Sequence, residues 1–167
     1  KVSDVLIRYN NVSGCIFEVY GGEWGTIVAG SADGFAKNNM VTIYNTVNVK
    51  GDVFGGDGTL WGGSYNIVNI CDGSVNGNIV GGSYYSLSRE GSNDYNTISL
   101  GGIVEYDANR KITKVDGNKG KVAIGASIQG TNADGGGNQL NVLSMGNTVE
   151  MSVVGIDTIN FFIPNIP

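Results

Sequence analysis

Short segments of this chain alternate apolar and polar residues with a period of two. Residues 39–56 read NMVTIYNTVNVKGDVFGG, in which the segments VTI, VNV and DVF each place apolar side chains on alternate positions. Successive side chains of an extended strand point to opposite faces, so this pattern predicts three short, half-buried strands. The rest of the chain shows no convincing helical period. The pattern therefore predicts an all-β protein.

The same pattern recurs along the chain behind an opening asparagine. Asn39, Asn66, Asn96 and Asn138 open successive copies at intervals of 27, 30 and 42 residues, and a fainter copy begins near Asp4. One copy of three short strands cannot bury a core by itself, but stacked copies close a core between neighbouring coils. We expect a parallel, right-handed β-helix of about five coils, each made of three short strands.

Alignment on the double glycines that end several copies predicts which residues stack. One inward column contains Val19, Val53, Ile79 and Val153, and another contains Cys15, Val49, Val75 and Val149. The opening asparagines are expected to form a hydrogen-bonded ladder at one turn of the coil. The double glycines are expected to adopt positive φ at a tight corner.

The fourth copy carries an insertion, EYDANRKITKVDGNKG, at residues 105–120. Its alternating pattern on both sides of residues 107–110 predicts a projecting hairpin. Half of the ten basic residues lie in or beside this insertion, at Arg110, Lys111, Lys114, Lys119 and Lys121. The hairpin is therefore either a solvated loop tip or a docking loop for an anionic partner.

Composition and charge narrow the function classes. The 167 residues include 28 glycines and carry a net charge of −5, with a sequence pI near 4.5. An acidic chain lacks the basic surface that nucleic acid requires, so nucleic acid is not an expected partner. No apolar run is long enough to insert into a membrane. We expect residues 1–167 to form a single β-helical segment, cut from a larger secreted or surface protein.

Catalytic groups are few. The chain contains no histidine, which removes the nucleophile–histidine triads and the commonest metal ligand. No metal or other cofactor is expected, and the expectation is that the chain is not an enzyme. The alternative is a polysaccharide-acting β-helix enzyme: the alignment puts the carboxylates of Glu18 and Asp52 in one outward column on adjacent coils, near the spacing that retaining glycosidases use.

Aromatic residues give a candidate binding surface. Trp24, Trp61, Tyr84 and Tyr85 each follow a double glycine closely, so stacking is expected to gather their rings along one edge of the coil. Such an edge would bind sugar faces or a protein groove. Alternatively, the loops fold over and bury their own rings.

The segments NNMVTIYNTVNVKGDVFGG and NIVNICDGSVNGNIVGG resemble the glycine- and asparagine-rich repeats of autotransporter passenger domains. The resemblance covers about residues 4–100 well and residues 138–156 weakly. It implies display on a bacterial cell surface or secretion, with a role in adhesion, aggregation or host contact. The partners it implies are a surface glycan or protein, or a second copy of the chain. A passive spacer in a stalk is a further alternative, and the single segment KVAIGASIQG is similar to the head repeats of trimeric autotransporter adhesins.

Overall fold

The computed structural model describes residues 5–9, 11–44, 47–58, 61–83, 93–109, 111–117, 122–131, 135–144 and 152–162. All secondary-structure elements in these ranges are β-strands, and none of the described residues belongs to a helix that is long and apolar enough to cross a membrane. The predicted all-β class is confirmed.

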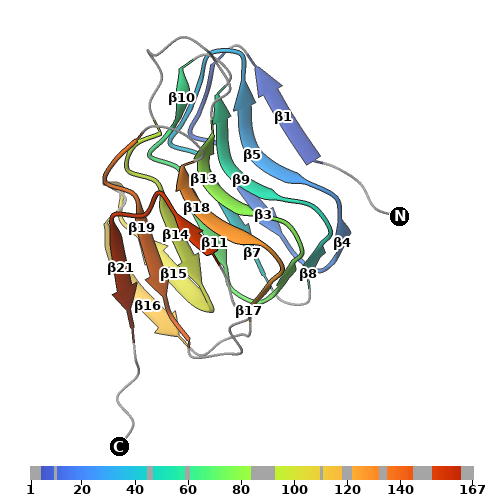
Figure 1. The fold of residues 1–167 in the computed structure, drawn as a ribbon, viewed down its shortest axis with the longest axis vertical. Coiled ribbons are helices and arrows are strands. Elements are labelled where there is room, and N and C mark those ends of the chain that lie inside the picture. The colour runs from blue at the N-terminus through green and yellow to red at the C-terminus, as the bar shows by residue number, and fades with distance from the viewer. Residues whose placement is uncertain are drawn as a thin grey trace, which may run out of the picture.

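The coil is built from four stacks of parallel strands, three of which supply the residues of the main core cluster (Figure 1). The first sheet contains β1 (Val5–Tyr9), β5 (Ile27–Ala32), β9 (Val53–Gly58), β13 (Ile79–Ser83), β18 (Ser127–Thr131) and β20 (Ser152–Val154). The second contains β3 (Ile16–Val19), β7 (Met40–Ile43), β11 (Ile67–Ile70), β14 (Thr97–Leu100), β19 (Gln139–Val142) and β21 (Thr158–Phe161). The third contains β4 (Gly22–Trp24), β8 (Val47–Val49), β12 (Gly73–Val75) and β17 (Val122–Ile124). A short fourth sheet contains β2 (Val12–Ser13), β6 (Phe35–Lys37) and β10 (Gly62–Ser64).

The chain visits these sheets in a repeating order. From β7 it passes to β8 in the third sheet and β9 in the first, and after β10 it returns to the second sheet at β11, beside β7. Neighbouring strands in each stack are parallel, and they stay in register apart from an irregularity between Leu6 and Arg8 of β1. The predicted parallel β-helix is therefore confirmed. The short fourth sheet is an addition that the three-strand pattern did not predict.

The inward columns are partly as predicted. Val53 pairs with Ile79, and Val49 pairs with Val75, and all four side chains are buried. The residue that precedes Val53 in its column is Ile27, not Val19. Val153 belongs to the same column, but Ile128 lies between it and Ile79. Val19 instead pairs with Ile43 in the second sheet, and Trp24 takes the position predicted for Cys15. Val149 lies outside the described residues.

The first copy was misaligned because two different corners share one local sequence. EVYGG contains the end of β3 in the second sheet, whereas DVFGG contains the beginning of β9 in the first sheet. Both place an apolar residue before a pair of glycines, so the motif alone does not distinguish them. The register of the strands therefore corrects the alignment of the first copy.

The predicted asparagine ladder is confirmed at the corner before the second sheet. Each backbone N–H of Asn39, Asn66 and Asn96 donates to the Oδ1 of the next asparagine, at 3.0, 3.0 and 2.9 Å. All four asparagines, including Asn138, are fully buried. The amides thus satisfy backbone groups inside the coil, where water is excluded.

Gly21 and Gly22 of the first copy have the predicted positive φ, of 69° and 93°, but the double glycines of the second and third copies do not, so the prediction is wrong for those two copies. They instead make room for the ladder. A Cβ on Gly56 would collide with Asn66 Nδ2, and a Cβ on Gly82 would collide with the carbonyl oxygen of Gly63 and lie 2.7 Å from Asn96 Nδ2. Glycine is required at these positions because the ladder amides, and at Gly82 also a backbone carbonyl, occupy the space that a Cβ atom would need.

The predicted hairpin is confirmed as β15 (Gly102–Tyr106) and β16 (Ile112–Gly117), which pair antiparallel. It follows β14 directly, and Tyr106 at the end of β15 hydrogen-bonds to the second sheet. The hairpin therefore lies against the outer face of that sheet.

Candidate functional site

The outer face of the second sheet carries two columns of side chains. The strand positions that alternate with them, such as Val41 and Ile43, are buried in the core. The first outward column is Ile16, Met40, Ile67, Thr97, Gln139 and Thr158. The second is Glu18, Thr42, Asn69, Ser99, Asn141 and Asn160. The face thus changes from apolar to polar along its first column and is polar along its second.

Hydrogen bonds join side chains of the second column into a chain across the strands, in which Tyr106 supplies the link between Asn69 and Ser99. Asn69 Nδ2 donates to Thr42 Oγ1 at 3.2 Å, and Asn141 Nδ2 donates to Ser99 Oγ at 3.1 Å. Asn160 Nδ2 extends the chain to Asn141 Oδ1 at 3.0 Å. Buried polar groups are costly unless they are paired, so this chain fixes the surface on which the hairpin rests.

Tyr106 anchors the hairpin to this column. Its hydroxyl donates to Asn69 Oδ1 at 3.0 Å and lies 3.3 Å from Ser99 Oγ, so it joins neighbouring strands β11 and β14. The turn that follows is fixed by Asp107, whose Oδ1 accepts the backbone N–H groups of Asn109 and Lys111 at 2.8 and 2.9 Å. Tyr106 therefore attaches the hairpin to the sheet, and Asp107 stabilises the hairpin's own turn.

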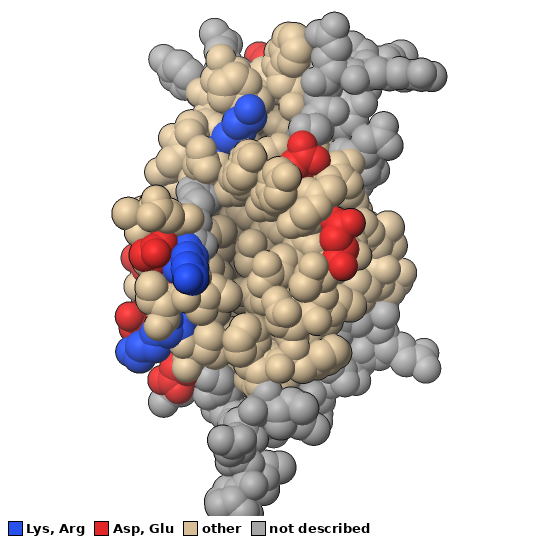
Figure 2. Space-filling view, turned by 90° about the vertical axis from the view of Figure 1, so that its left-hand side faces the viewer, with Lys and Arg blue, Asp and Glu red and all other residues tan. Residues whose placement is uncertain are grey.

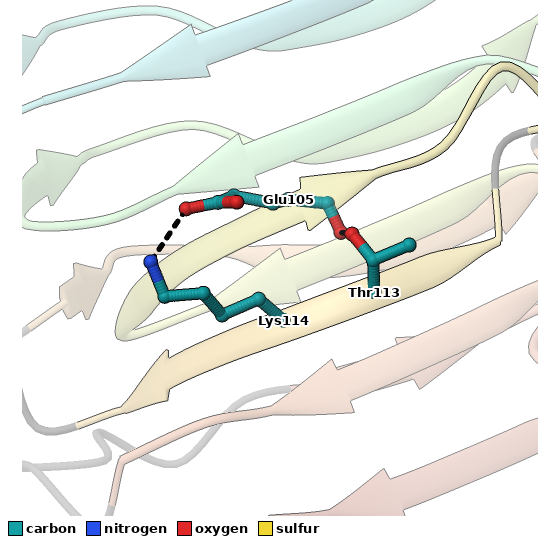
Figure 3. A network of polar contacts seen from close by, with 3 residues as sticks. All are labelled: Glu105, Thr113 and Lys114. Atoms are coloured by element: carbon teal, nitrogen blue, oxygen red, sulfur yellow. Dashed lines mark hydrogen bonds and ion pairs between the residues drawn. The ribbon is translucent and has the colours of Figure 1, made fainter.

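The outward side of the hairpin has its own polar contacts (Figure 3). Lys114 Nζ donates to Glu105 Oε1 at 2.7 Å, and Thr113 Oγ1 donates to the Glu105 carbonyl oxygen at 3.1 Å. The ion pair raises the pKa of Lys114, chiefly through its hydrogen bond to Glu105. One of the basic residues predicted for docking is therefore already paired with a carboxylate.

Two grooves lie beside Tyr106 along the first outward column. The β15-side groove has a volume of about 340 Å³ and is lined by Gly14, Ile16, Met40, Ile67, Tyr106, Asp107 and Ala108. The β16-side groove has a volume of about 310 Å³ and is lined by Thr97, Tyr106, Lys111, Ile112 and Gln139. Both are at the lower end of the roughly 300–1,000 Å³ found for ligand pockets. The first is lined mainly by apolar side chains, whereas most described lining residues of the second carry a polar group and its surface is about equally polar and apolar.

Two stacked tyrosines lie directly after neighbouring strands of the second sheet, Tyr20 after β3 and Tyr44 after β7. The rings of Tyr20 and Tyr44 are parallel within 3°, with centroids 4.4 Å apart, and Tyr20 is 67 % exposed. Tyr44 Oη donates to Glu18 Oε1 at 3.0 Å. Burial raises the pKa of the Tyr44 hydroxyl above its ordinary value, and the hydrogen bond and charge of Glu18 raise it further.

The two described members of the predicted aromatic row, Trp24 and Trp61, are not brought together. Trp24 lies in the inward column of the third sheet, packs against the core, and donates its indole N–H to the Gly21 carbonyl oxygen at 2.9 Å. Trp61 is 47 % exposed and directly precedes β10 of the fourth sheet, on another side of the coil. The strand register that places Trp24 inward separates it from Trp61. Tyr84 and Tyr85 lie outside the described residues.

The predicted basic cluster is only partly described. Lys111 lines the β16-side groove, and Lys114 pairs with Glu105. Arg110, Lys119 and Lys121 lie outside the described residues. Figure 2 shows a face on which basic and acidic atoms lie side by side at one margin, while uncharged residues form most of the surface beyond them. The charged side chains of this face are therefore mixed in sign.

The predicted carboxylate pair is not formed. Glu18 lies on β3 in the second sheet and pairs in register with Thr42, whereas Asp52 lies at the turn before β9 in the first sheet. Asp52 Oδ1 accepts the backbone N–H of Asn78 at 2.6 Å. The misaligned first copy had placed the two residues in one column. The described residues also contain no group of three or more Cys, Asp or Glu side chains that could hold a metal ion.

Sequence reasoning missed Tyr106 and the tyrosine pairs. The alternation in GIVEY, with Ile103 and Glu105 exposed, does indicate that Val104 and Tyr106 face the other way. The stacked pair Tyr65 and Tyr95, with centroids 5.1 Å apart, precedes successive ladder asparagines, so its spacing was visible once the ladder was aligned. The tyrosines that directly precede ladder asparagines therefore predict which rings stack better than the aromatic residues that follow double glycines.

Comparison of the chain with protein-family models, curated proteins and solved structures yields no match.

Proposed function

We propose that this chain is a ligand-binding segment of an extracellular β-helical adhesin, with its binding surface on the outer face of the second sheet beside the hairpin. The observation that carries the proposal is the pair of grooves that share Tyr106. A scaffold that served only as a spacer would have no need of an inserted hairpin fixed across its sheet by Tyr106. Fold by itself does not assign function, so the proposal depends on this surface.

A glycan suits this surface better than an added peptide strand. The grooves lie over a sheet face, whereas a peptide that extends a sheet must bind at a strand edge. Sugars present apolar ring faces and hydroxyl groups. The grooves offer both kinds of partner: Ile16, Met40 and Tyr106 for ring faces, and Thr97 and Gln139 for hydroxyl groups.

The resemblance to autotransporter passenger repeats supports the same proposal. It suggests display on a bacterial cell surface, where a β-helix holds binding loops away from the membrane. In this proposal the coil supplies rigidity and the hairpin supplies the binding surface, with no chemistry performed on the ligand.

A glycan array tests the proposal. The full chain is compared with a variant in which residues 103–116 are replaced by a short Gly–Ser loop, and with Trp61→Ala as a matched aromatic control. Surface insertions contribute little to a stacked core, so the loop variant should keep the melting temperature of the parent. We expect it to lose glycan binding while Trp61→Ala retains it.

Two array results would refute the proposal. Binding that survives in the loop variant and disappears in Trp61→Ala would move the site to the fourth sheet. An array on which the parent chain binds nothing would leave the segment as a passive spacer.

A further inference from the structure

The β16-side groove contains a lysine whose charge no other described lining residue balances. Of the five described residues that line the groove, Lys111 is charged and the other four are neutral. Among the described residues, the ion pairs join Lys50 to Glu23 and Lys114 to Glu105, and neither involves Lys111. Lys111 is exposed, and a lysine on the wall of a groove favours an anion from solution when no carboxylate is paired with it.

The backbone holds Lys111 in a fixed position at the groove. Its N–H donates to Asp107 Oδ1 at 2.9 Å, and its carbonyl oxygen accepts the Asp107 N–H at 2.9 Å. Asp107 is the nearest carboxylate in sequence, but it lines the β15-side groove, and its Oδ1 is occupied by two N–H groups of the turn. Its contacts therefore fix the backbone at Lys111, while Asp107 itself is not among the described residues that line the β16-side groove.

The other groups of this groove match the rest of a sugar. Gln139 Nε2 donates to Asn141 Oδ1 at 2.7 Å, and among the described residues this leaves its second amide hydrogen and its carbonyl oxygen for a ligand. Thr97 adds a hydroxyl group, and Ile112 adds an apolar wall. One cation, an amide, a hydroxyl and an apolar wall together suit a ring that carries hydroxyl groups and one acidic group.

We infer that the β16-side groove binds an acidic sugar unit, with Lys111 paired to its carboxylate or sulfate group. The inference rests on the proposed function and names the ligand class of that site. The β15-side groove, lined mainly by apolar side chains, then contacts an adjoining uncharged part of the same glycan. The two grooves follow one outward column, in which neighbouring coils are separated by about 4.8 Å, close to the length of one sugar ring.

Calorimetric titration with defined oligosaccharides tests this inference. The probes are a galacturonic acid tetramer, a galactose tetramer and a sulfated galactose tetramer. Lys111→Ala should raise the Kd for the acidic probe that binds by about tenfold, as expected for the loss of a charge-assisted hydrogen bond. Lys111→Arg should retain most of the affinity. Lys114→Ala, which removes a paired lysine from the same hairpin, should change Kd by less than about twofold.

The two acidic probes distinguish a carboxylate ligand from a sulfate ligand. Equal weakening by Lys111→Ala and Lys114→Ala would overturn the inference, because diffuse charge would then explain the binding. Tighter or equal binding of the neutral galactose tetramer would also overturn it. If neutral glycans bind and only the loop variant loses them, the proposed function stands and the acidic subsite is wrong. If no glycan binds at all, both are wrong.

Discussion

Asn66 Oδ1 accepts two hydrogen bonds from Asn39 on the preceding coil, from its backbone N–H at 3.0 Å and from its Nδ2 at 3.2 Å. Asn96 Oδ1 receives the same two bonds from Asn66, at 3.0 and 3.2 Å. Each amide therefore acts as acceptor for one neighbour and donor to the next. This repeated contact links the coils from within.

Removal of one amide from the ladder should destabilise the coil strongly. Asn66→Ala leaves the Asn39 N–H and the Ala36 carbonyl oxygen without their partner, and both are buried. Each unpaired buried group costs about 1–3 kcal/mol, so we expect a loss of about 3 kcal/mol in the free energy of unfolding measured in urea. Asn76→Ala, at an exposed turn, should change it by less than about 0.5 kcal/mol. Similar losses in the two variants would contradict the ladder.

The ladder also shows how much the sequence could predict. The four opening asparagines were identified correctly because a turn that repeats in every coil repeats its residue. The ladder ends differently: Asp157 Oδ2 accepts the Asn138 N–H at 3.0 Å, and Asn138 Nδ2 has no partner among the described residues. A sequence pattern based on asparagine does not reveal an aspartate in the last place.

The candidate site was harder to predict because it depends on register. Trp24 and Trp61 follow similar glycine pairs, yet one ring lies inward on the third sheet and the other is exposed beside the fourth. Tyr106 contacts Asn69, which is 37 residues away, through a hairpin whose direction no local signal fixes. Periodicity thus predicts which elements form, but the contacts between an insertion and a distant coil come from the folded structure.

The double glycine gives a second test of the ladder. Gly82→Ala would push a methyl group into the Gly63 carbonyl oxygen and toward Asn96 Nδ2. Because backbone atoms cannot move aside easily, we expect a loss of about 3 kcal/mol or more, measured by urea unfolding. Gly136→Ala is the matched control, since a Cβ there meets no atom within 4 Å. That variant should be neutral or more stable by up to about 1 kcal/mol.

Matched isoleucine truncations test the inward and outward assignment. Ile79 is fully buried between Val53 and Ile128, whereas Ile16 is 69 % exposed on the second sheet. Ile79→Ala should lower the free energy of unfolding by about 2–5 kcal/mol, and Ile16→Ala by less than about 0.5 kcal/mol. Thermal and urea unfolding of both variants would check this. A large loss in Ile16→Ala alone would reverse the assigned faces.

The two cysteines should differ in reactivity. Both thiols are free, and Cys15 is half-buried, whereas Cys71 is 4 % exposed. Burial, with a smaller effect of the Asp72 charge, raises the pKa of the Cys71 thiol to about 11. Since the thiolate is the reactive form, iodoacetamide at pH 8 should label Cys15 well before Cys71. Mass spectrometry of Cys15→Ser and Cys71→Ser would assign the two rates, and faster labelling of Cys71 would contradict the buried position.

Tyr44 should make the fold sensitive to alkaline pH. Its hydroxyl has a raised pKa in the folded state, first through burial and then through the hydrogen bond and charge of Glu18, while an unfolded tyrosine titrates near its ordinary value of about 10. Above that pH the unfolded chain loses a proton that the folded chain keeps. Unfolding is then favoured, so the contribution of Tyr44 is complete below about pH 10 and is lost as the pH rises toward the folded pKa.

Tyr44→Phe should remove this dependence. At pH 7 it loses the hydrogen bond to Glu18 and about 0.5–1.5 kcal/mol, because the bond lies near the surface. Between pH 9 and 11 the difference in stability between parent and variant should shrink, since only the parent carries the phenol at this position. Urea unfolding at each pH measures both curves, with Tyr95→Phe as control for loss of a phenol from the other stacked pair. If the Tyr44→Phe and parent curves stay parallel up to pH 11, the contact between Tyr44 and Glu18 does not perturb the hydroxyl.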